Sequence, residues 1–313
     1  MPVQFAVLAS GSQGNATLVQ AGGVGTLLDL GLGPRALGTR LESVRSGWER
    51  IGSAILTHTH GDHVDEATLD YMARQRVILF CHEGHRVDLA ERPGFQMLEL
   101  AGLVRHYDDR PFLTPSGLRV EPVELRHDGP TFGFRVEAKP GRGARPVALG
   151  YVADTGSWSD LMAETLAEVD LLGVEFNHDV EMQRRSGRSA ALIARNLGDR
   201  GHLSNEQGAG LLAAVLRQSG PAAVRHVVLL HLSQQCNRPN LALRAARASL
   251  RGEGRRASVH AARQATAHPD LLVTASRRRS VAAAGRPRVA GRSPTPDFRF
   301  PEDPVPGPAG DDA

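Results

Sequence analysis

The sequence predicts a layered α/β sandwich, and the distribution of strand-like and helix-like patterns along the chain is what predicts it. Short apolar runs of strand length dominate residues 1 to about 136, whereas strands mix with longer helices in the second half. A doubly wound parallel sheet would instead alternate strands and helices along the whole chain. With 313 residues and 41% hydrophobic content, the chain can bury a sizeable core.

The first half is a series of apolar runs separated by Gly, Asn and Asp, the residues that favour turns. Strands are predicted at residues 3–8, 17–19, 26–30, 54–57, 77–80, 118–125 and 132–136. A helix is predicted at 66–73, because Leu69, Met72 and Ala73 recur at helical spacing. Residues 127–130, His-Asp-Gly-Pro, are predicted to form the turn between the last two of these strands.

The second half mixes strands and helices after a polar hairpin loop predicted at 137–146. Strands are predicted at 147–153, 170–175 and 224–230, and helices at 158–168, 187–198, 204–218 and 241–250. Residues 257–273 are expected to add a last pair of strands. We therefore predict one domain at 1–275. A disordered Arg- and Pro-rich tail is expected at 276–313, where seven prolines accompany a run of three arginines.

Composition and sequence patterns indicate the cellular location of the protein and the class of its partners. No apolar run approaches the roughly 20 residues needed to cross a bilayer, and the N-terminus lacks the basic start of a signal peptide. Cys81 and Cys236 are far apart, which argues against a disulfide framework and a structural zinc ribbon. We expect a cytoplasmic protein with no membrane partner. The net charge of +3 comes from arginines with a single lysine, which suits a polyanionic partner because arginine pairs bidentately with phosphate.

Residues 57–63, Thr-His-Thr-His-Gly-Asp-His, place three imidazoles and a carboxylate on a predicted strand-to-helix loop. Such groups desolvate unfavourably when they are buried without partners, and a bound cation is one way to offset that cost. His58 and His60 are two residues apart, so in an extended segment they point the same way. Asp62 and His63 then turn at the start of the helix and can face a second position.

Three more candidate ligands each follow an apolar strand, where a side chain is held rigidly. They are His127, Asp154 and His231. Each alone is more often a hydrogen-bonded structural residue, but their joint appearance with the loop favours a metal site. If Asp154 bridges two ions, His58, His60 and His127 would hold one ion, and Asp62, His63 and His231 the other. A donor set of nitrogen and oxygen atoms suits Zn²⁺ or Mn²⁺.

The His-x-His-x-Asp-His run and these strand ends resemble the metallo-β-lactamase-fold hydrolases, as do residues 8–15 and 27–31. Residues 174–182, 201–206 and 231–234 are similar to the YycJ (WalJ) subgroup, regarded as 5′-to-3′ DNA exonucleases. The resemblance covers about residues 3–275. It implies a four-layer αββα sandwich with two divalent metal ions at the sheet edges, and DNA as the partner.

The resemblance also implies a phosphodiesterase mechanism. Two cations would activate a hydroxide for in-line attack on phosphorus. Asp62 would ligate one ion and help to orient the hydroxide. His202 is the candidate acid for the leaving group, and Glu175 is the partner that keeps it charged. The alternative for His202 is a structural position at the start of the following helix.

Substrate contacts are less defined by the sequence. Ser10, Ser12 and Asn15 lie on a Gly-rich loop and either donate to a phosphate or shape the loop. His178 either lines the substrate entrance or is structural. The alternatives to a DNA exonuclease are an RNA-processing nuclease and a metallohydrolase of a small molecule such as a cyclic phosphodiester, thioester or lactone. A catalytically silent scaffold is disfavoured, because it would not need seven ligands.

Overall fold

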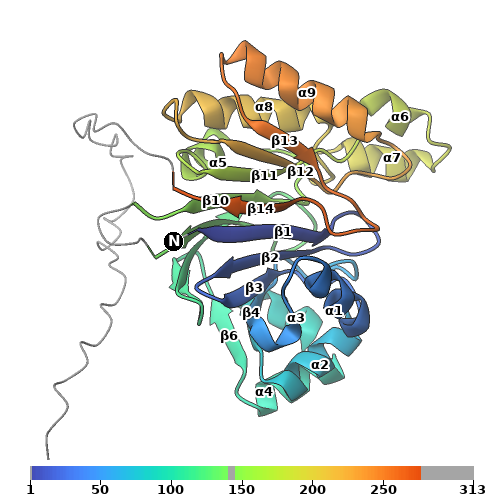
Figure 1. Cartoon of the computed structure of the whole chain (residues 1–313). Helices are drawn as coiled ribbons and strands as arrows, with labels where there is room; N and C mark the ends of the chain where they lie inside the picture. The colour runs from blue at the N-terminus through green and yellow to red at the C-terminus, as the bar shows by residue number, and fades with distance from the viewer. Residues whose placement is uncertain (1, 140–144, 276–313) are drawn as a thin grey trace, which may run out of the picture. The chain divides into compact units, whose positions relative to one another are not determined.

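Two seven-stranded sheets lie face to face within residues 2–139 and 145–275, the parts of the chain that the computed structural model describes. Helices cover both outer faces, which confirms the predicted four-layer αββα sandwich (Figure 1). The predicted tail at 276–313, and residues 140–144 of the predicted hairpin loop, lie outside the described residues. Within the described residues, every helix is too short or too polar to span a bilayer.

The first sheet is antiparallel on one side and parallel on the other. Its spatial order is β14 (Asp270–Val273), β1 (Val3–Ala9), β2 (Ala16–Ala21), β3 (Val24–Leu28), β4 (Ile51–Ile55), β5 (Ile78–His82) and β6 (Val104–Tyr107). Strands β14 to β3 pair antiparallel, and β3 to β6 pair parallel. Because parallel strands end at the same edge, the residues that follow β3 and β4 come together there.

The second sheet repeats this arrangement. Its order is β13 (Ser258–Ala261), β12 (His226–Leu230), β11 (Leu171–Glu175), β10 (Ala148–Val152), β9 (Phe132–Ala138), β8 (Leu118–Glu124) and β7 (Phe112–Leu113). Strands β10 to β13 pair parallel, and β7 to β10 pair antiparallel. The ends of β10, β11 and β12 therefore share one edge.

Three apolar clusters separate the layers. The inner cluster packs between the sheets and includes Phe5 of β1 and Phe134 of β9, both fully buried. A second cluster lies under the helices of the first sheet, α1 (Pro34–Ser43), α2 (Glu66–Gln75), α3 (Arg86–Leu89) and α4 (Pro93–Leu100). A third lies under α5 (Asp160–Thr165), α8 (Asn205–Arg217) and α9 (Pro239–Gly252). Central strands such as β10 and β11 are buried on both faces, which is why they appear as continuous apolar runs.

The helix starts follow from local sequence. Asp65, Ser159, Ser189 and Ser204 accept hydrogen bonds from backbone N–H groups in the first turns of α2, α5, α7 (Ala190–Leu197) and α8. Proline stands at the start of α1, α4 and α9, where its missing N–H costs nothing. The short α6 (Val180–Arg184) and the 3₁₀ turns η1 (Trp48–Arg50) and η2 (Glu83–His85) complete the set among the described residues.

Residues 257–273 form the two expected strands, but the strands do not pair with each other. Instead, β13 pairs with β12 in the second sheet and β14 pairs with β1 in the first. The two neighbouring segments therefore close different sheets, a choice that depends on distant strands. The helices α1 and α4 were also not predicted. In α1 only Leu37 and Leu41 are buried, so its apolar pattern is too sparse to indicate a helix.

His85 in η2 is a buried, neutral histidine whose contacts predict a pH-dependent stability. Its Nε2–H donates to the carbonyl oxygen of Pro130 at 3.0 Å, and its Nδ1 accepts from the backbone N–H of His82 at 3.2 Å. Burial is the main reason that the pKa of His85 is lowered to about 4. The hydrogen bond to Pro130 raises this pKa, and the nearby His82 lowers it further. A second proton on Nδ1 would cost the bond from His82.

Acid is therefore expected to destabilise the fold through His85. Because the folded-state pKa is lowered, the unfolded chain binds the proton first, and stability is lost as the pH falls from about 6.5 toward 4. Between pH 7 and pH 5 this loss amounts to about 2 kcal/mol of the free energy of unfolding. Urea unfolding of wild type and His85→Gln at both pH values measures it. A pH-independent difference between the two proteins would contradict the assignment.

Candidate metal centre

The predicted metal residues come from the ends of strands in both sheets. His58 to His63 follow β4, His127 follows β8, Asp154 follows β10 and His231 follows β12. All except His60 and Asp62 are buried. Asp154 and His231 have positive φ values of 59° and 54°, a conformation that non-glycine residues rarely adopt. Such strained positions are concentrated at functional sites, where surrounding contacts hold them.

The structure brings these residues together in the two groups that the sequence predicts. His58, His60 and His127 each offer a nitrogen, and these nitrogens lie within 4.8 Å of one another. The ligand atoms of Asp62, His63 and His231 satisfy the same limit. Asp154 also groups with His58 and His63, one member of each set. Its carboxylate therefore lies within reach of a donor from each group.

Among the described residues, several candidate ligand atoms in this cluster have no hydrogen-bond partner. The Nε2 atoms of His58 and His231 and Oδ2 of Asp154 are buried without a hydrogen bond. Oδ2 of Asp154 lies 3.0 Å from Nε2 of His63, an approach expected of two groups that share an ion. Because buried polar atoms are costly when unpaired, the cluster fits a divalent cation that accepts nitrogen and oxygen donors.

The charges in the cluster are also compatible with a bound cation. Burial alone would raise the pKa of Asp154, but His231 and His63 outweigh it and hold this pKa well below its usual range. Burial would lower the pKa of His231, but Asp154, Asp62 and Glu175 raise it to about 10. Without a metal, protons on the imidazoles supply the positive charge that the carboxylates attract. Metal ions that replace those protons would meet the same demand.

Asp29 supports the metal loop, although it is not among the residues predicted from the sequence. It follows β3, is fully buried and has a φ of 63°. Its carboxylate accepts from Nδ1 of His63 at 2.8 Å and from the backbone N–H of Thr57, also at 2.8 Å. This fixes the ring of His63 with Nε2 toward the cluster. The signal that identified Asp154, a carboxylate at a strand end, was present here too.

Other ligands are oriented in the same way through the ring nitrogen that does not face the cluster. Nδ1 of His127 donates to the carbonyl oxygen of Gly201 at 3.0 Å. The side-chain amide of Asn177 lies 3.2 Å from Nδ1 of His231 and donates to the carbonyl oxygen of that residue at 2.9 Å. These outer contacts set ring orientation and tautomer before any ion binds.

Glu175 connects His202 to the metal cluster. One carboxylate oxygen, Oε1, lies 2.9 Å from Nδ1 of His202 and 3.2 Å from Nδ1 of His231. The other accepts from the backbone N–H groups of Thr155 at 2.9 Å and Leu203 at 3.3 Å. Burial would raise the pKa of Glu175, but His202 and His231 lower it to about 2, so the carboxylate is charged at neutral pH.

The predicted substrate contacts lie in different surroundings. The hydroxyl of Ser10 accepts from the backbone N–H of His231 at 2.7 Å, and Nδ2 of Asn15 lies 2.9 Å from Nε2 of His63 and 3.3 Å from Oδ2 of Asp62. Both side chains thus brace metal residues. Ser12 is exposed on the loop, and His178 is fully buried, with neither ring nitrogen in a hydrogen bond to any residue that the structure describes.

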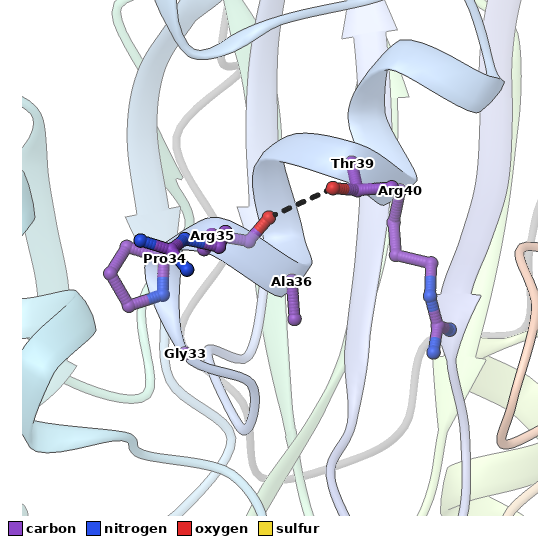
Figure 2. A pocket seen from close by; sticks show the side chains of 6 residues that line it. All are labelled: Gly33, Pro34, Arg35, Ala36, Thr39 and Arg40. Carbon is purple, nitrogen blue, oxygen red and sulfur yellow. Dashed lines mark hydrogen bonds between the residues drawn. The ribbon is translucent and has the colours of Figure 1, made fainter.

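A separate surface hollow lies over the first turns of α1 and contains none of the metal residues. Figure 2 shows its lining, in which the hydroxyl of Thr39 donates to the carbonyl oxygen of Arg35 at 3.2 Å. The guanidinium of Arg40 donates to the carbonyl oxygens of Leu8 and Gln264. These polar groups of the hollow already bind backbone carbonyl oxygens of the chain. The histidine–carboxylate cluster is therefore the better candidate for the catalytic site.

Comparisons with known proteins agree with this geometry. A family model described as "Beta-lactamase superfamily domain" matches residues 26–232. The chain is 27% identical over 249 residues to exodeoxyribonuclease WalJ of Streptococcus pneumoniae serotype 2, covering 76% of this chain and 85% of that protein. It is 28% identical to exodeoxyribonuclease YycJ of Bacillus anthracis, over 77% of this chain and 87% of that one.

The fold is also shared with a solved structure. The metallo-beta-lactamase fold protein YhfI from Bacillus subtilis superimposes with a TM-score of 0.61 at 16% identity, covering 85% of this chain and 99% of that chain. At this identity the likeness concerns the fold, and the chemistry is argued from the site itself.

Proposed function

We propose that this chain, which belongs to the beta-lactamase superfamily, is a metal-dependent phosphodiesterase that degrades DNA in the 5′-to-3′ direction. The observation that carries the proposal is the Glu175–His202 pair at the edge of the metal cluster. The similarity to two exodeoxyribonucleases supports DNA as the substrate. Hydrolysis of a carboxylic ester would not require such an acid beside the metals, which disfavours a lactonase or β-lactamase.

The metal ligands of the proposed site are His58, His60, Asp62, His63, His127, Asp154 and His231. Two divalent ions, Zn²⁺ or Mn²⁺, would polarise the phosphodiester and lower the pKa of a water molecule toward about 7. Asp62 is the most accessible carboxylate of the set, with 24% of its side chain exposed, so it can face both a ligand position and the attacking water. The side-chain amide of Asn15 donates a hydrogen bond to this carboxylate.

His202 would protonate the leaving oxygen. Its Nδ1 is engaged by the charged carboxylate of Glu175, which leaves Nε2 as the atom that can deliver a proton. The side chain is 14% exposed, so this nitrogen can reach a bound substrate, whereas Glu175 is fully buried. Glu175 thus acts through His202, since it fixes the ring and stabilises the charged imidazolium.

Cleavage of DNA ends by the wild-type protein tests the proposal. Metal-loaded protein is expected to degrade linear duplex DNA and to leave circular duplex DNA intact, and chelation with EDTA should abolish the activity. Parallel reactions with 5′-phosphorylated, unphosphorylated and RNA substrates define the preferred end and nucleic acid. Turnover of bis(p-nitrophenyl) phosphate with DNA and RNA both left intact would reject the nuclease assignment and favour a small-molecule phosphodiesterase.

Replacement of His202 by alanine is expected to slow the chemical step by about a hundred- to a thousand-fold, the usual contribution of a positioned acid. Metal content should stay near two ions per chain, because His202 is not assigned as a ligand. Single-turnover cleavage and elemental analysis of the same preparation measure the two quantities. Loss of metal from the variant would show instead that His202 is a ligand or supports the fold.

A further inference from the structure

We infer that the segment from Arg184 to Arg200, which includes α7, forms a basic rim that binds the phosphate backbone of the substrate strand beyond the cleaved bond. The segment from 181 to 200 contains five arginines and two acidic residues. This short segment alone therefore carries a net charge of +3, as much as the whole chain. This inference deepens the proposed function and rests on it for the identity of the polyanion. We call residues 184–200 the basic rim.

Two side-chain contacts attach the basic rim to the loops that carry metal residues. Arg195 forms an ion pair with Asp128, the residue that follows His127. The guanidinium of Arg188 donates to Oε1 of Gln235 at 2.9 Å and 3.3 Å, in the loop that follows His231. The contact of Arg195 therefore connects the rim to the loop of His127, and the contact of Arg188 connects it to the loop of His231.

The backbone makes the same connection at the end of the rim. The carbonyl oxygen of Asn196 accepts from the N–H of His202 at 3.1 Å, and the carbonyl oxygen of Gly201 accepts from Nδ1 of His127 at 3.0 Å. The chain thus passes from the basic rim directly to the proposed acid. A strand held at the metal cluster would therefore pass close to this end of the basic rim.

The basic rim belongs to the surface. In α7 only Asn196 is buried, and α6 and α7 lie together at the right of Figure 1. Arg184 and Arg200 are exposed and have no side-chain partner among the described residues, so their charges are available to a ligand. Arginine suits this role because its planar guanidinium binds phosphate oxygens bidentately.

The rim contrasts with the hollow over α1, where Arg40 is already engaged by backbone carbonyl oxygens (Figure 2). Contacts to phosphates carry no sequence information, so the rim predicts binding without sequence preference. Aromatic residues make up only 4% of the chain, which agrees with recognition through charge more than through base stacking.

The test measures how salt weakens binding of a duplex oligonucleotide with phosphorothioate linkages, followed by fluorescence anisotropy with the full metal-loaded chain. The rim variant is Arg184→Gln/Arg188→Gln/Arg200→Gln. Arg195 is left in place because its partner adjoins a metal residue. The matched control is Arg244→Gln/Arg247→Gln/Arg251→Gln, which removes the same charge from exposed positions of α9.

The binding constant for DNA falls as the salt concentration rises. For the rim variant, the magnitude of the slope of log binding constant against log salt concentration is expected to be smaller by about three, roughly one for each phosphate that the variant no longer neutralises. The control should change the slope by less than about one. If the triple variant is poorly folded, the single variants Arg184→Gln and Arg200→Gln should each lower the slope by about one. Equal slopes for rim and control variants would overturn the inference.

The result is separable from that of the proposed function. Wild-type protein that cleaves DNA ends while rim and control variants bind alike would retain the nuclease assignment and reject the rim. Protein that binds DNA with a rim-dependent slope but cleaves no nucleic acid would retain the rim and reject the nuclease assignment. If the rim variant changes only the oligomeric state in sedimentation, the surface is a contact between copies of the chain and the inference is overturned.

Discussion

Replacement of Asp62 by alanine is expected to reduce DNA cleavage by at least about a thousand-fold, which corresponds to about 4 kcal/mol of transition-state stabilisation. Asp62 is grouped with His63 and His231, and its Oδ2 lies 3.6 Å from Nε2 of each. Burial would raise its pKa, but the nearby imidazoles of His231 and His63 lower it overall, so the carboxylate is ionised at neutral pH. Alanine would remove both a proposed ligand and the group proposed to orient the attacking water.

Single-turnover cleavage of an end-labelled duplex measures this effect under metal-saturating conditions. The matched control is Asp70→Ala in α2, which removes a partly exposed carboxylate paired with Arg74 one helical turn away. Such surface pairs contribute little, so the control should cleave DNA within about twofold of wild type. Comparable rates for Asp62→Ala and Asp70→Ala would remove Asp62 from the proposed mechanism.

Replacement of Asp154 by asparagine is expected to lower the metal content from near two ions to one or none, and to abolish cleavage with it. Asp154 is the residue whose ligand atom approaches both groups, so its loss weakens both positions. Asparagine is the appropriate substitute because it tolerates the positive φ of 59°, whereas alanine would add backbone strain. The affinity for metal should fall by at least about a hundred-fold, the upper range for losing an outer-shell partner alone.

Elemental analysis gives the metal content, and the rise in melting temperature on adding Zn²⁺ or Mn²⁺ gives an independent readout. A ligand that binds only the native state raises stability according to its concentration relative to Kd, so weaker binding reduces the rise. Asp160→Asn, at an exposed position in the first turn of α5, is the control and should keep the full rise. Two ions per chain in Asp154→Asn would contradict the bridging position.

The elements predicted from sequence are those whose pattern is local. Strands β10 and β11 are continuous apolar runs because both faces are buried, and the start of α8 carries a capping Ser204. The pairing of β13 and β14 could not be predicted, since each joins a strand distant in sequence. The helix α1 was missed because it rests on the core through two leucines only.

The candidate site divides in the same way. The seven candidate ligands could be proposed from the sequence because donor-rich loops and polar strand ends are visible in it. Their supports could not be, since Ser10, Asn15 and Asn177 act through contacts with segments 48 to 221 residues away. Asp29 is the exception, because its position after β3 repeats the signal of Asp154.

The sequence by itself determined the chemistry available to this protein. The identity of the donors, five imidazoles and two carboxylates, is a property of residue types and does not require a fold to be recognised. Their division into two groups was predicted, but only the tertiary structure brings donors from both sheets within 4.8 Å of one another. Only the tertiary structure also places Glu175 between His202 and His231, and the basic rim beside the loops of His127 and His231. The physical reason is that parallel strand ends share an edge and two packed sheets bring their edges together, which no local pattern specifies.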